Sequence, residues 1–223
     1  MTASTPSECA DPAPPGARVE ELPAFYERVP AIVLRDPLAE LLGAAAGGVL
    51  RYGYADAVRL AGHSCPTVAS TYWLTHRALG LLYPDELPVR GLVEVSLPEP
   101  AGAGTTGVMG AIAGLLTGAA GEGGFHGLAG QHVRRGLLRF GVAQSTALVF
   151  RRTDTGTRVH AEAHLKHVAG DPRTMPLMQR CLAGQASADE RAEFGRLWQA
   201  RVERILLDHA HDDTVFRLSR FES

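Results

Sequence analysis

Apolar positions recur at helical spacing in some segments of the chain and alternate with polar positions in others. The helical spacing, together with caps and first-turn prolines, predicts helices that begin at Asp36-Pro37, continue over residues 52–60, and recur over residues 65–82, 107–117, 171–181 and 187–206. The alternating pattern predicts strands at residues 92–97, 136–142, 146–152 and 158–166. Helices therefore stand at both ends of the pattern and the strands are grouped between them.

This order predicts an α+β fold in which helices pack on one mixed β-sheet. Residues 21–210 are predicted to form a single domain, because a chain of 223 residues that is 45% hydrophobic can bury one sizeable core. Residues 1–20 are rich in Pro, Ala and Ser and lack the basic and apolar regions of a signal peptide, so we expect a disordered tail. Residues 211–223 are expected to be a C-terminal tail.

Charge, hydropathy and cysteine content exclude several classes of protein. The formal net charge is −2 and the basic residues are dispersed, so no binding surface for nucleic acid is expected. Apolar stretches are broken by Gly or charge before about 18 residues, which argues against a membrane span. Three widely spaced cysteines, Cys9, Cys65 and Cys181, fit neither a disulfide framework nor a zinc ribbon, and favour a reducing, cytoplasmic location.

The segment Ala61–Pro66 carries the clearest candidate chemistry, because His63 and Cys65 lie two residues apart where a helix is predicted to begin. Pro66 suits the first helical position, which makes Cys65 the expected N-cap. The helix dipole and the unpaired backbone N–H groups would then favour the thiolate, the form that binds metal. The alternative is that His63 and Cys65 are ordinary packing residues.

A zinc ion usually takes three or four ligands, so a third donor is needed. His160, Glu162 and His164 alternate along one predicted strand and would share one face of it. We choose His164 as the third metal ligand, with His160 or Glu162 as alternates. The competing interpretation is that all three belong to the solvated outer face of a hairpin.

Other residues are candidates for supporting roles. Glu162 or Glu94 would act as the catalytic base, and Glu122 and His126 lie in or near a Gly-rich loop where backbone can approach a cofactor. The pattern GxGxxG at residues 102–107 is interpreted as a decoy, because no βαβ unit precedes it.

The Ala61–Pro66 segment, followed by a helix that contains aromatic residues, resembles the FmdE family, which takes its name from formylmethanofuran dehydrogenase. The resemblance extends over residues 36–166, is strongest at this GHxCP signature, and continues more weakly through Thr106-Gly107-Val108 and Thr117-Gly118. It implies an α+β core, a bound metal usually taken as zinc, and a homodimer. It also makes Thr106 and Gly107 candidates for cofactor binding. Many relatives have cysteines where this chain has Thr106 and Ala119, which weakens any redox or cluster-binding interpretation.

The expected function is therefore metal binding by His63, Cys65 and His164, with an open position for water or a small-molecule ligand or substrate. Two alternatives stay open: a non-catalytic module that binds or delivers haem or another metal cofactor, and a dimeric interaction protein with a structural metal.

Overall fold

The computed structural model describes residues 21–222 and confirms the α+β class. Five strands form one mixed sheet in the order β4-β3-β5-β6-β7. Their bounds are β3 (Val93–Ser96), β4 (Leu138–Arg139), β5 (Leu148–Arg152), β6 (Arg158–Ala163) and β7 (Phe216–Phe221). β3 and β4 pair in parallel, whereas the other neighbours pair antiparallel.

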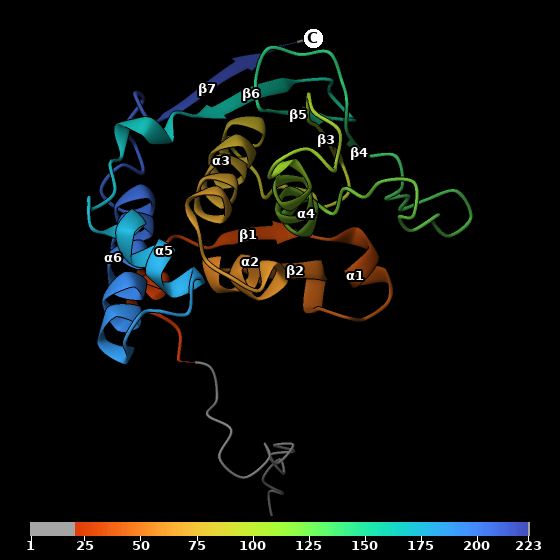
Figure 1. The fold of residues 1–223 in the computed structure, drawn as a ribbon. Coiled ribbons are helices and arrows are strands. Elements are labelled where there is room, and N and C mark those ends of the chain that lie inside the picture. Colours follow the sequence, from red (N-terminus) through yellow and green to blue (C-terminus); the bar gives the residue numbers. More distant parts are fainter. Residues whose placement is uncertain (1–20, 223) are drawn as a thin grey trace, which may run out of the picture.

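The helices lie to one side of this sheet (Figure 1). α3 and α4 pack directly against it, α2 packs against both of them, α6 packs against α3, and α5 packs against α6. Their bounds are α2 (Tyr54–Ala61), α3 (Pro66–Leu82), α4 (Thr106–Thr117), α5 (Thr174–Leu182) and α6 (Ala188–Leu206). Short 3₁₀ turns are η1 (Ala24–Arg28), η2 (Ala46–Gly48) and η3 (Leu165–His167). No helix within residues 21–222 is both long and apolar enough to span a membrane.

The prediction of one helix from Asp36 to Leu50 is wrong. Only α1 (Pro37–Leu41) is helical, and β1 (Ile32–Arg35) pairs antiparallel with β2 (Val49–Tyr52) around it. Gly43 ends the helix directly after its cap, with a φ of 68°. Gly48 then has a φ of 67° and lies so close to the carbonyl oxygen of Asp36 that a side chain would collide there.

The prediction of a C-terminal tail is also wrong. Residues 216–221 form β7, an edge strand that pairs with β6 over its full length. The strand predicted at residues 158–166 ends at Ala163, so His164 and Lys166 lie beyond it. The predicted N-terminal tail lies outside the described residues.

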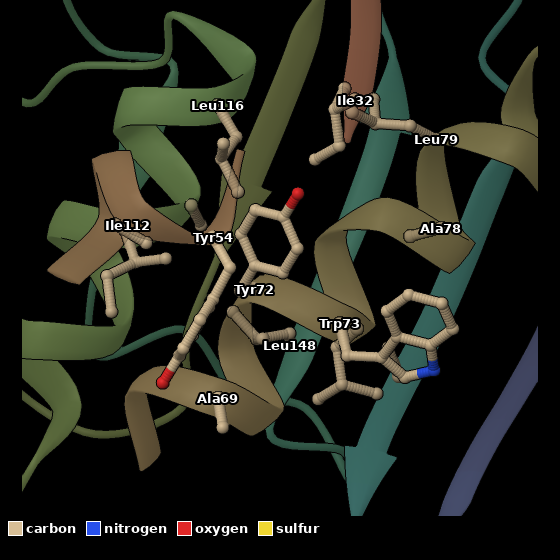
Figure 2. Packing of buried hydrophobic residues seen from close by; sticks show 14 of the residues in the cluster. Ile32, Tyr54, Ala69, Tyr72, Trp73, Ala78, Leu79, Ile112, Leu116 and Leu148 are labelled. Carbon is tan, nitrogen blue, oxygen red and sulfur yellow. The ribbon is translucent and has the colours of Figure 1, made fainter. Parts of the chain in front are cut away.

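The core lies between the sheet and α3 (Figure 2). Tyr54, Tyr72 and Trp73 are fully buried, and the ring centroids of Tyr54 and Tyr72 are 5.5 Å apart. Polar groups on two of these rings bind distant backbone: the Tyr72 hydroxyl donates to the Pro30 carbonyl at 2.8 Å, and Trp73 Nε1 donates to the Ala210 carbonyl at 2.5 Å. The core thus joins the N-terminal hairpin and the C-terminal segment to α3.

A buried charged cluster fastens α1 to the Gly-rich loop of residues 118–136. Asp36 caps α1 by accepting from the backbone N–H groups of Leu38 and Ala39. Its carboxylate also pairs with Arg134 at 2.6 Å and with Arg90 at 2.9 Å. The side chains of Asp36 and Arg134 are only 5% and 7% exposed, so these charges depend on each other.

Candidate functional site

Cys65 is the N-cap of α3, as the sequence predicts, with Pro66 in the first turn. Its backbone is extended, with φ of −147° and ψ of 169°. The backbone N–H of Val68 points to Cys65 Sγ at 3.5 Å. The thiol is half-buried and free. A sulfur atom at this position faces the positive end of the helix dipole.

His63 is exposed at the turn between α2 and α3. Its Nδ1 lies 2.9 Å from the carbonyl oxygen of Ala61. A carbonyl can only accept, so the proton is assigned to Nδ1 and Nε2 carries the lone pair. Histidines that bind metal commonly use the other ring N–H in this way, because the hydrogen bond fixes the ring and its tautomer.

Ser64, between the two donors, is held by hydrogen bonds from two helices. Tyr54 on α2 donates to Ser64 Oγ at 2.9 Å, and Ser64 Oγ donates to Gln199 Oε1 at 3.0 Å. The Ser64 carbonyl accepts from Trp198 Nε1 at 2.9 Å and from Gln199 Nε2 at 3.3 Å. We call residues 63–65 the donor loop. The anchors on α6 fix its backbone and hold His63 and Cys65 in place.

These anchors are not predictable from the sequence. Trp198 falls on the apolar stripe of α6, and Gln199 carries no signal beyond being a polar neighbour of that stripe. Ser64 and Gln199 are 135 residues apart in the sequence, so their contact can be recognised only in the folded structure, where α6 packs beside the donor loop.

Tyr26 and Tyr54, which lie close to the donor loop, also line a cavity of about 470 Å³. Tyr26 also reaches Gln199 Oε1, at 3.3 Å. Burial raises the pKa of both tyrosines above the ordinary value, so both hydroxyls stay protonated at neutral pH and act as donors. Arg51 and Arg59 line the same cavity. With Glu27 in the lining as well, the cavity combines aromatic walls with charges of both signs.

The structure does not bring His164 to the donor loop. Within residues 21–222, no three or more His, Cys, Asp or Glu side chains form a group that could hold a metal ion. Val159 and Ala161 of β6 face the core, and His160 and Glu162, which alternate with them, face away from α3. His164 Nε2 instead contacts Glu162 Oε1 at 3.2 Å. Metal binding by His63 and Cys65 stays a prediction, and the described chain supplies two donors for it.

The other candidates lie apart from the donor loop, and no hydrogen bond or ion pair described between residues 21 and 222 joins them to it. Glu94 is on the outer sheet face, 3.7 Å from Arg139. His126 Nδ1 is 3.3 Å from Arg135, and Glu122 is exposed nearby. Thr106 and Gly107 begin α4, where the backbone of Gly107 packs closely against the Ala101 carbonyl. Their predicted roles in catalysis and cofactor binding stay predictions.

Comparison with known proteins gives no family: no family model matches the sequence, and no curated protein matches it. The resemblance to the FmdE family therefore continues to rest on the GHxCP signature itself.

Proposed function

We propose that this chain is an FmdE-like metal-binding protein in which the donor loop binds a transition metal ion, Zn²⁺ first, through His63 and Cys65. The observation that carries the proposal is the 2.9 Å contact between His63 Nδ1 and the Ala61 carbonyl, which leaves Nε2 available as a ligand. The N-cap position of Cys65 adds a sulfur atom two residues away as a second donor. Imidazole and thiolate are the ligands that zinc prefers.

Two donors per chain leave coordination positions for water and for a small ligand or substrate, which the neighbouring cavity would hold. A bound zinc ion supplies Lewis acidity and lowers the pKa of a bound water. The chain's own contribution is to fix the two donors through Ser64 and to line the cavity with the side chains of Tyr26 and Tyr54. The homodimer and the cytoplasmic location that we expect from the sequence belong to the same proposal.

Metal analysis of the purified protein tests the proposal. We expect zinc in the wild type, and its loss in His63→Ala and in Cys65→Ser. Both variants should fold, because His63 is exposed and serine is itself a good N-cap residue. Matched controls are His167→Ala, another exposed histidine, and Cys181→Ser, another half-buried thiol; both should retain zinc.

Two further readouts separate the alternatives. His164→Ala should also retain zinc, because His164 contacts Glu162 rather than the donor loop. A colourless zinc protein would argue against haem binding, whereas a visible haem spectrum that disappears in His63→Ala would favour it. Unchanged metal content in both donor-loop variants would refute the proposal.

A further inference from the structure

The sheet face opposite α3 and α4 carries an unusual concentration of charge. No helix of the described chain crosses this face (Figure 1). Following the strand register, the charged side chains on it are Glu94, Arg139, Arg151, Arg158, Glu162 and Arg217. Arginine outnumbers the acids, so the acids on this face cannot neutralise every guanidinium group.

Arg151 and Arg158 are neighbours on this face, and neither forms a hydrogen bond with a carboxylate among residues 21–222. They are direct cross-strand partners on β5 and β6, and like charges in this position repel each other. Arg151 Nη1 lies 3.9 Å from Glu94, beyond hydrogen-bond distance, and Arg151 Nε is buried without a partner. Arg158 is exposed and its side chain makes no hydrogen bond or ion pair with the rest of residues 21–222. An anion between the two guanidinium groups would relieve this repulsion.

There is space for such an anion. A cavity of about 230 Å³ is lined by both arginines together with Ser96, Gln144, His160 and one acid, Glu94. An adjoining cavity of about 410 Å³ shares Arg158 and His160 and extends to Phe221. The rings of His160 and Phe221 meet edge to face, with centroids 4.8 Å apart, so this part of the groove has an aromatic wall.

Two acids, Glu94 and Glu222, line the groove together with the two arginines. Glu94 lies 3.7 Å from Arg139 and is shared between it and Arg151. Glu222 pairs with Arg220 at 2.8 Å and accepts from Thr157 at 3.2 Å. Because each acid also pairs with an arginine outside the groove, the acids do not fully neutralise Arg151 and Arg158.

We propose that this groove binds a small organic acid, with a phosphate or carboxylate group between Arg151 and Arg158 and an apolar or ring portion against His160 and Phe221. Guanidinium groups bind both acids through paired N–H donors, which explains why two arginines face one cavity. The site is separate from the donor loop and does not depend on metal.

Titration calorimetry in low-salt buffer tests the proposal with inorganic phosphate, phenyl phosphate and benzoate as probes. The wild type should bind phenyl phosphate more tightly than inorganic phosphate, and comparison with benzoate identifies the preferred acid group. Arg158→Gln and Arg151→Gln should each weaken binding by about tenfold or more, as expected for loss of a charged hydrogen bond. Phe221→Ala should remove the advantage of phenyl phosphate over inorganic phosphate.

Arg217→Gln is the matched control. Arg217 lies on the same face, is 66% exposed and contacts Glu162 at 3.9 Å, but it does not line the groove. Its substitution should change affinity by less than about twofold, as for other exposed charges. The proposal is wrong if the wild type binds none of the three probes, or if Arg158→Gln and Arg217→Gln have the same effect. Because Arg158 is exposed, its substitution should leave the melting temperature unchanged.

Discussion

The Asp36 carboxylate pairs with two arginines and also caps α1, so single substitutions there should have large effects on the stability of the fold. We expect Asp36→Asn to keep the cap, because asparagine also caps helices well, but to leave Arg134 buried without a counter-charge. Removing one partner of a buried ion pair costs about 3–5 kcal/mol in the free energy of unfolding. Urea denaturation measures this loss.

Glu40→Gln is the control for that measurement. Glu40 pairs with Arg35, but both side chains are about half exposed, at 42% and 50%. An exposed ion pair contributes less than about 1 kcal/mol, so Glu40→Gln should be nearly neutral. Equal losses in the two variants would show that the Asp36 cluster does not stabilise the fold.

The same carboxylate should make stability depend on acid pH. Burial alone would raise the pKa of Asp36, but the hydrogen bond from Arg90 and the charges of Arg134 and Arg90 outweigh it and lower the pKa below its ordinary value of 3.8. A lowered folded pKa contributes stability above the unfolded pKa, and that contribution is lost as pH falls through the folded value. The stability gap between wild type and Asp36→Asn should therefore be constant near neutrality and shrink below about pH 4. Thermal melts across this range measure it; a gap that stays constant would contradict the assignment.

At the scale of elements, α6 should control how well the donor loop holds metal. Trp198→Phe removes the hydrogen bond to the Ser64 carbonyl and keeps most of the apolar contact area. Loss of a supporting hydrogen bond near a metal ligand commonly costs about 10–100-fold in metal affinity, and the lower end is expected here because Ser64 is not itself a ligand. Zinc competition with a coloured chelator measures the change. Trp73→Phe, which removes a hydrogen bond to Ala210 instead, should leave zinc affinity unchanged.

β7 offers a second test at this scale, because its two phenylalanines face opposite sides of the sheet. Phe216 is fully buried, so Phe216→Ala should cost about 3–5 kcal/mol in unfolding free energy. Phe221 is 50% exposed, and Phe221→Ala should cost less than about 1 kcal/mol. Similar losses in urea denaturation would show that the strand's orientation is wrong.

Local signals explain which elements could be predicted from sequence. Cys65-Pro66 and the capping box at Ser187 mark the starts of α3 and α6 correctly, because caps act through neighbouring residues. β1 and β2 escape prediction because leucines in the intervening segment fit a helical period, whereas glycines with positive φ end the helix there. β7 escapes prediction because an edge strand is defined by pairing with its partner, here β6.

The candidate site also has parts that the sequence predicts and parts that it does not. The donor pair and its helix start are readable from one short segment, but the anchors Trp198 and Gln199 depend on tertiary packing. The alternation of His160 and Glu162 is also readable, yet periodicity alone cannot say which face of a strand meets the core. The apolar residues that alternate with them, Val159 and Ala161, decide it by packing inward.

For the whole molecule, metal stoichiometry distinguishes a site within each chain from one shared between two chains. We expect one zinc ion per chain, easily removed by chelators because the described chain supplies only two donors. Metal analysis combined with light scattering, before and after chelation, gives both the ratio and the oligomeric state. One ion per two chains, with dissociation on chelation, would instead make the metal a bridge between copies.

The hydrogen bond between Ser64 and Gln199 also has a consequence for biosynthesis. The segment that carries His63 and Cys65 leaves the ribosome long before Gln199, which lies 135 residues further along. A nascent chain therefore exposes the imidazole and the thiol in an unrestrained form, and the two side chains reach their folded arrangement only after Gln199 has been synthesised.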